Sequence, residues 1–112
     1  MINYNNKNYV CLLDLAMDTI RGKWKAVLIC HLTEGPKRFL ELQRITRGVS
    51  HKVLTEKLRE LEEDNLIEKI VYAENPPKVE YTLTQAGTDL AVSIKGIENW
   101  AMKYYSDIVD RI

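Results

Sequence analysis

Polar side chains that follow Ser50 have the types and the spacing needed to hydrogen bond with nucleic acid. At about 100° per residue of a helix, Leu54, Leu58 and Leu61 fall on one side. The opposite side carries a mixed set of donors and acceptors: His51, Lys52, Thr55, Glu56 and Arg59. Lysine and arginine donate to guanine, a carboxylate accepts from cytosine, and a threonine methyl contacts thymine. The pattern therefore predicts a helix that buries its leucines and offers its other side to base edges and phosphates.

The first turn of such a helix normally contacts the bases, so we expect His51, Lys52 and Thr55 to read base edges. Arg59 lies farther along and suits a phosphate. Ser50 is a good N-cap, because its hydroxyl can accept a hydrogen bond from a backbone amide of the first turn. The amides there also favour a phosphate. For each side chain the alternative is an ordinary solvated polar residue, and for Glu56 that alternative is favoured.

Two further cations are candidates for DNA contacts outside this helix. Arg38 can form a forked pair with a phosphate. Its alternative is a surface arginine that packs its stem on Phe39. Lys78, at the tip of an expected hairpin, could lie over a minor groove, with solvation as the alternative.

The distribution of charge is more informative than its sum. The formal net charge is zero, which by itself argues against a nucleic-acid partner. Residues 37–59, however, include seven basic residues and only two acidic ones, and an acidic stretch follows in the sequence. This arrangement suggests a positive face. An ordinary solvated helix surface explains the charges equally well.

The order of the expected elements indicates a winged helix-turn-helix. Apolar periodicity and turn residues predict helices at 10–20, 24–32, 39–45 and 50–64, strands at 66–73 and 78–83, and a long last helix at 84–110. In a winged helix-turn-helix, two short helices flank a turn that often contains glycine, and a β-hairpin follows them. We expect a mostly α fold with a small β-hairpin and one domain over residues 1–112.

An apolar seam runs along the last helix with alternating spacings of four and three. It consists of Leu90, Ile94, Ile97, Ala101, Tyr104 and Ile108. Such a narrow seam resembles a coiled coil and predicts a partner helix. The alternative is a stripe that packs in the core of the same chain.

Several other classes of protein are disfavoured. Cys11 and Cys30 have no metal-ligand spacing, and no phosphate loop or nucleophile motif is present. The acidic stretch after Arg59 has no neighbouring histidine or cysteine, so it predicts a solvated flank. No apolar run has the roughly 20 residues of a membrane helix, and the polar N-terminus has no signal-peptide core. We expect a cytoplasmic protein that is not an enzyme, with no cofactor, metal or membrane partner.

Four segments, taken in their order along the chain, resemble the HxlR-type winged helix-turn-helix transcriptional regulators of bacteria. They are Cys11 with Gly22-Lys23-Trp24-Lys25, then Gly35-Pro36-Lys37-Arg38-Phe39, then Val49 to Thr55 with Asn65-Leu66-Ile67, and lastly Pro77 to Thr84 with Gly87. Together they span roughly residues 11–87. The resemblance implies a sequence-specific regulator that binds a palindromic operator of double-stranded DNA as a homodimer. It names no effector.

The resemblance also implies roles for the two ends of the chain. Dimer contacts would come from the helix at 10–20, through Leu13 and Met17, and from the helix at 84–110. Some members of this family sense oxidants or electrophiles with a cysteine at the position of Cys11. The family's usual Cys-Pro is Cys11-Leu12 here, although a helix N-terminus still favours the reactive thiolate. The alternative for Cys11 is a small buried hydrophobe.

One function from another class stays open at this point. Winged helices also dock on proteins, and a net charge of zero suits a protein-interaction module. A positive surface around Arg38, Lys52 and Arg59 would favour DNA instead.

Overall fold

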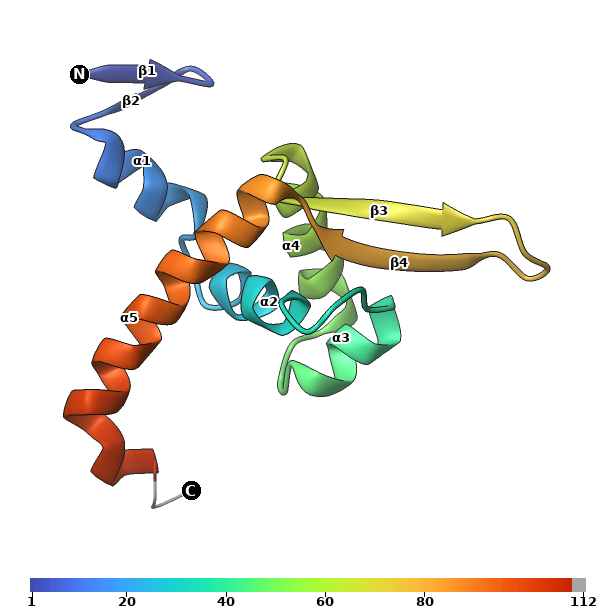
Figure 1. Ribbon diagram of the computed structural model, residues 1–112. Helices are drawn as coiled ribbons and strands as arrows, with labels where there is room; N and C mark the ends of the chain where they lie inside the picture. The colour runs from blue at the N-terminus through green and yellow to red at the C-terminus, as the bar shows by residue number, and fades with distance from the viewer. Residues whose placement is uncertain (110–112) are drawn as a thin grey trace.

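The computed structural model describes residues 1–109, which form five helices and two antiparallel hairpins. The elements are β1 (Ile2–Tyr4), β2 (Lys7–Tyr9), α1 (Leu12–Thr19), α2 (Lys25–Leu32), α3 (Phe39–Ile45), α4 (His51–Glu63), β3 (Ile67–Tyr72), β4 (Lys78–Leu83) and α5 (Gln85–Val109). Figure 1 shows α2, α3 and α4 gathered at the centre, with the β3–β4 wing projecting to one side and α5 running away from it. The winged helix-turn-helix expectation is confirmed.

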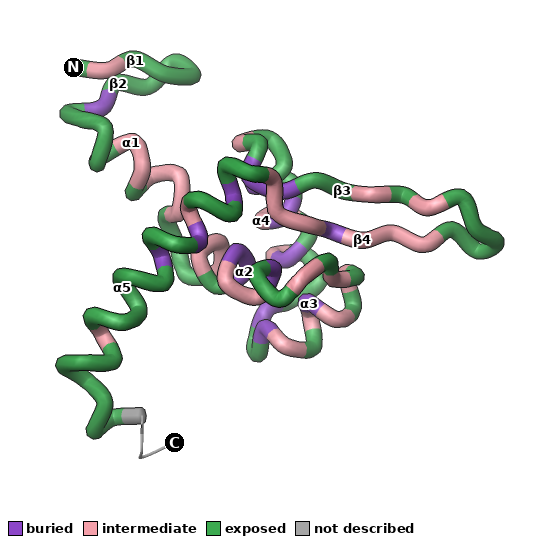
Figure 2. The backbone as a smooth tube through the Cα atoms, viewed as in Figure 1, coloured by how far each residue is buried: buried purple, intermediate pink, exposed green. Residues whose placement is uncertain are grey.

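The core lies where α2, α4, the base of the wing and the first half of α5 meet. Leu54, Leu58 and Leu61 of α4 are at most 1% exposed, so the expected leucine stripe is buried. Leu28 and Ile29 of α2 are fully buried against them. Figure 2 shows this buried centre beside an exposed wing tip, an exposed distal α5 and an N-terminal segment that is mostly exposed.

Local caps define the ends of α4 and the start of α5. The hydroxyl of Ser50 accepts a hydrogen bond from the amide of Val53 at 3.1 Å, as expected for an N-cap. Asn65 ends the helix with a φ of 59°, the left-handed conformation that asparagine tolerates. Thr84 then caps α5 by accepting from the amide of Gly87 at 3.0 Å. Gly87 lies so close to the backbone of Leu66 that a Cβ would collide with its carbonyl oxygen.

The wing also forms a backbone bridge to the segment before α3, which the sequence analysis did not identify. β3 and β4 pair from Ile67 opposite Leu83 to Tyr72 opposite Lys78. On the other edge, the amide of Lys37 donates to Tyr81 at 3.0 Å, and the amide of Tyr81 donates back at 2.8 Å. This bridge fixes the start of α3 to the wing.

The N-terminal arm, residues 1–9, also carries structure that was not expected. β1 and β2 pair across a two-residue turn in which Asn5 and Asn6 have φ values of 50° and 62°. Two consecutive residues at positive φ are typical of a type I′ hairpin turn, which favours asparagine. The arm therefore forms a small hairpin in front of α1.

The outer helices begin close to their expected positions. Cys11 is the N-cap of α1, so the helix starts at Leu12. α5 is described to Val109, and residue 110 of the expected span lies outside the described residues. Over residues 1–109, no helix is long and apolar enough to cross a membrane.

Candidate DNA-binding surface

The outward side of α4 is polar and open to solvent. His51, Lys52, Thr55 and Arg59 are all exposed, opposite the buried leucines. Ser50 is exposed as well, at the N-terminal end where helix amides point outward. The helix therefore presents the predicted face at its surface.

Two of the predicted base readers already have contacts within the chain. The ring of His51 lies against the ring of Phe39 from α3, with centroids 4.7 Å apart. The hydroxyl of Thr55 donates to the carbonyl oxygen of His51 at 2.8 Å. Thr55 keeps its methyl group and its oxygen lone pairs for a partner. One face of His51 is held by Phe39, which restricts how its ring can approach a base.

The two predicted cations of α4 differ in their present partners. Within residues 1–109, the side chain of Lys52 has no ion pair or hydrogen bond. Arg59 pairs with Glu63 at 3.0 Å, with both side chains more than half exposed. Such a surface pair contributes at most about 1 kcal/mol. A phosphate can therefore displace Glu63 from Arg59 with little loss of free energy. Lys52 has no such partner to give up before it binds DNA.

Arg38 is placed by both the wing and α3. Its amide donates to the Glu41 side chain at 3.1 Å, which caps the first turn of α3. The neighbouring Lys37 is bridged to Tyr81. The backbone of Arg38 is thus anchored on both sides while its side chain is exposed. This geometry suits a fixed phosphate contact.

Lys78 lies at the start of β4 rather than at the tip of the wing. Its ammonium is 3.6 Å from the carboxylate of Glu80 and 4.8 Å from the centre of the Tyr72 ring. A hydrogen bond to Glu80 raises the pKa of the Tyr72 hydroxyl. Tyr72 of β3 contacts Lys78 and Glu80 of β4 across the hairpin, so a DNA contact by Lys78 competes with these neighbours.

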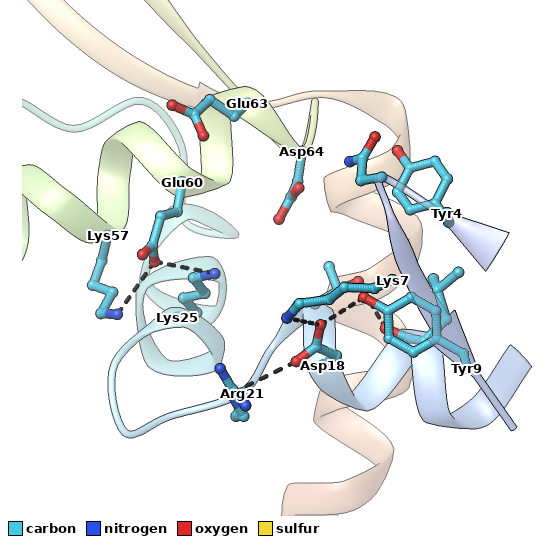
Figure 3. A pocket seen from close by; sticks show the side chains of 13 residues that line it. Tyr4, Lys7, Tyr9, Asp18, Arg21, Lys25, Lys57, Glu60, Glu63 and Asp64 are labelled. Atoms are coloured by element: carbon cyan, nitrogen blue, oxygen red, sulfur yellow. Dashed lines mark hydrogen bonds and ion pairs between the residues drawn. The ribbon is translucent and has the colours of Figure 1, made fainter.

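The basic block of the sequence is divided between two faces of the fold. Arg44 and Arg47 are exposed at the end of α3 and in the turn that follows, and their positions could have marked them as phosphate contacts. Lys57 instead lies with Lys25 on the other flank of α4, at 3.2 and 3.1 Å from Glu60 (Figure 3). Partial burial raises the pKa of Glu60, but hydrogen bonds from these two lysines bring it below its ordinary value.

A second ionic cluster joins the N-terminal arm to α1. Asp18 accepts from the hydroxyl of Tyr9 at 2.7 Å and from Lys7 at 3.3 Å, and Arg21 lies 3.6 Å away (Figure 3). The Tyr9 hydroxyl, followed by Lys7, lowers the pKa of the Asp18 carboxyl. A hollow of about 310 Å³ separates this cluster from α4. None of the predicted residues is in this cluster.

Cys11 is exposed, so the core of its own chain does not bury it as the alternative interpretation expected. Its side chain makes no capping hydrogen bond at the start of α1. Asp14 accepts from the amide of Val10 at 2.9 Å, which places a carboxylate in the first turn after Cys11. Cys30 is half-buried in α2, and burial followed by the charge of Glu98 raises the pKa of its thiol.

The predicted dimer residues differ in how far their own chain buries them. Leu90 and Ile94 pack in the core of the chain itself, and Ile94 is only 7% exposed. Ala101 is half-buried. The others are at least 49% exposed: Leu13, Met17, Ile97, Tyr104 and Ile108. The core-stripe alternative therefore describes the first part of the seam, while its distal part and α1 leave apolar side chains in solvent.

The sequence family decides what this arrangement is. The family model described as HxlR-like helix-turn-helix matches residues 19–109. The chain belongs to this family. The HxlR-like assignment covers α2 to α5, including the helix-turn-helix and the wing.

Curated relatives and solved structures agree with the HxlR-like assignment. The HTH-type transcriptional regulator YdeP of Bacillus subtilis (strain 168) is 39% identical over 99% of this chain and 87% of its own length. The redox regulator HypR in its reduced form superposes with a TM-score of 0.80 at 36% identity, over 91% of this chain and all of HypR. Reduced YodB from B. subtilis gives 0.77 at 35% identity, over 86% and 95% of the two chains. The chain is a DNA-binding transcriptional regulator of the helix-turn-helix class.

Proposed function

We propose that this HxlR-like regulator acts in the cytoplasm as a homodimer that reads a palindromic operator without catalysing a reaction. Each protomer inserts the first turn of α4 into a major groove, with Lys52 and Thr55 at base edges and Ser50 at a phosphate. Arg38 and Arg59 contact the backbone, and Lys78 of the wing approaches the neighbouring groove. Two such helices would lie about one turn of DNA apart, roughly 34 Å.

The observation that carries this proposal is the exposed first turn of α4. A partner-free lysine and an available threonine lie there on a helix whose other side is buried. Exposed arginines also lie on α3 and in the turn between α3 and α4. Cations spread over two helices suit a phosphate backbone, which supplies much of the affinity and makes it dependent on salt.

The apolar surface outside the core supports the homodimer. α1 exposes Leu13 and Met17, and the distal half of α5 exposes Ile97, Trp100 and Tyr104. Monomeric proteins rarely leave large apolar patches in solvent. Sedimentation of the whole chain tests this part: Ile97→Asp should shift a dimer to monomer, whereas Met102→Asp, equally exposed on another side of α5, should leave it dimeric. Identical sedimentation of the two variants would contradict the assignment of the seam.

We further propose that Cys11 adjusts operator affinity in response to oxidation. Its thiol is exposed at the N-terminus of α1, next to the apolar surface proposed for the dimer. HypR is described as a redox regulator, and YodB has been solved in reduced and diamide-treated forms. A hydroperoxide would transfer one oxygen atom to the Cys11 thiolate, giving a sulfenic acid and releasing an alcohol or water.

Selection of bound sites from a random DNA pool tests the central proposal. The expected result is a palindromic consensus whose half-sites are separated by about one helical turn. Failure to enrich any sequence would favour the protein-interaction module instead. A consensus without two-fold symmetry would contradict the homodimeric arrangement while leaving DNA binding in place.

A further inference from the structure

A groove of about 940 Å³ lies between the end of α2, the end of β4 and one flank of α5. Its lining includes the apolar side chains of Leu83, Ala91 and Val92, and the half-buried Cys30 also lines it. The volume is within the range of about 300–1,000 Å³ that is usual for small-molecule sites. The proposed DNA-reading residues of α4 take no part in its lining.

Gly96 lines this groove, and its lack of a side chain leaves space there. A glycine inside a helix costs about 1 kcal/mol relative to alanine. Gly96 does not have the positive φ of Gly22, Gly35 and Gly48, and a Cβ built on it would meet no atom within 4 Å. Neither backbone conformation nor close packing within the described chain therefore requires a glycine there. Its position in the lining means that a larger side chain would extend into the groove.

The groove and the proposed dimer seam lie on different flanks of α5. At about 100° per residue, Val92, Gly96 and Asn99 project to one side of the helix axis. The exposed seam residues Ile97 and Tyr104 project roughly to the other side. A partner protomer that covers the seam would therefore leave the groove open to solvent.

The polar groups around the groove favour an uncharged occupant. Lys95 and Glu98 at its edge form an ion pair at 2.6 Å, so their charges offset one another. The hydroxyl of Thr33 donates to the carbonyl oxygen of Cys30, and that of Thr88 donates to the carbonyl oxygen of Thr84. Both hydroxyls keep lone pairs that can accept a hydrogen bond. An apolar surface with acceptors beside it suits an apolar ligand that carries a donor.

We propose that the groove between α2, β4 and α5 binds a small, uncharged, mainly apolar molecule with a hydrogen-bond donor. The occupant packs on Leu83, Ala91 and Val92 and donates to a threonine hydroxyl. It contacts a helix of the DNA-binding half and the helix proposed to carry the dimer seam. The site goes beyond the proposed function, because ligand binding here requires neither DNA nor a dimer.

The test uses N-phenyl-1-naphthylamine, a fluorescent, uncharged aromatic amine with one N–H donor, and the full chain without DNA. Gly96→Leu fills the groove, while Gly96→Ala gives a similar gain in helix propensity with little added bulk. Saturable binding is expected for the parent chain and Gly96→Ala, and about tenfold or more weaker binding for Gly96→Leu. Thermal unfolding of both variants checks that the fold is retained.

A second measurement places the probe in the groove. In a Cys11→Ser background Cys30 is the one cysteine of the chain, and the probe should slow its alkylation by N-ethylmaleimide. The absence of saturable binding, equal binding by the two Gly96 variants, or an unprotected Cys30 would each overturn the proposal. Since these assays contain no DNA, failure of the operator selection would leave their outcome unaffected.

Discussion

The imidazole ring of His51 lies against the phenyl ring of Phe39, with their centroids 4.7 Å apart and their planes inclined by 50°. Phe39 opens α3 and His51 opens α4, so the contact joins the first turns of the two helices of the helix-turn-helix. The contact links the N-terminus of α4 to the first turn of α3. We therefore propose that His51 positions the first turn of α4 for DNA in addition to being a candidate base reader.

Phe39→Leu should weaken operator binding by up to about fivefold, because loss of a ring contact of about 1 kcal/mol lets the first turn of α4 leave the arrangement that binds DNA. In a His51→Ala background the same substitution should have little further effect. A double-mutant cycle by fluorescence anisotropy measures this coupling. Additive losses would show that the rings act independently.

Lys52→Ala should lower operator affinity about tenfold or more and relax the preference at one base pair, since a good base contact contributes about 1–3 kcal/mol. Lys57→Ala is the matched control, because this lysine of the same helix is paired with Glu60 on the other flank. Mobility shift on the selected operator compares the two. An equal loss in both variants would remove Lys52 from the interface.

Arg59→Ala should weaken binding to all sequences alike and reduce the salt slope of log K by about one unit, as expected for one lost phosphate contact. Glu63→Gln should raise affinity a few-fold, because it frees Arg59 from its 3.0 Å pair. Titrations at several salt concentrations measure both effects. A changed base preference in Arg59→Ala would contradict the backbone role.

Asp18 should make the attachment of the N-terminal arm dependent on pH. Its pKa is lowered in the folded chain by the Tyr9 hydroxyl and then by Lys7. A carboxyl with a lowered pKa stabilises the folded arrangement fully above its unfolded pKa of about 4, and this stabilisation is lost as pH falls through the lower folded value. Hydrogen exchange of residues 2–9 should therefore be slower in the parent chain than in Asp18→Asn at pH 7.

That difference between the parent chain and Asp18→Asn should shrink at pH values below about 4. Asp89→Asn is the control, because the Asp89 carboxylate accepts a hydrogen bond from Gln85 of α5 and takes no part in holding the arm. A difference that persists undiminished in acid would show that the charge of Asp18 does not hold the arm.

Features that depend on neighbours along the chain could be predicted from the sequence. The leucine stripe of α4 follows from helical periodicity, and the Ser50 and Thr84 caps follow from residue type beside an apolar run. The surface position of Lys52 and Arg59 follows from the same helical periodicity, because both lie opposite the leucine stripe. These are the parts of the candidate site that the structure places as predicted.

Contacts between distant segments could not be predicted in the same way. The bridge from Lys37 to Tyr81 depends on the wing folding back beside α3. The split of the basic block depends on Lys25 of α2 meeting Glu60 of α4. The burial of Ile94 depends on which part of α5 reaches the core, because its spacing in the seam is the same as that of exposed Ile97. The Asn5-Asn6 turn was a local signal that could have indicated the N-terminal hairpin.

Cys11→Ser should abolish the change in operator affinity that a hydroperoxide causes, while Cys30→Ser should retain it. The two thiols differ in the properties that control reactivity: Cys11 is exposed at a helix N-terminus, and the Cys30 thiol is half-buried with a raised pKa. The thiolate is the reactive form, so Cys11 should react first. Anisotropy with the selected operator, before and after treatment and again after added thiol reductant, measures the response. A full, reversible response in Cys11→Ser would exclude Cys11 as the sensor. It would assign a thiol response to Cys30, the only other cysteine of the chain.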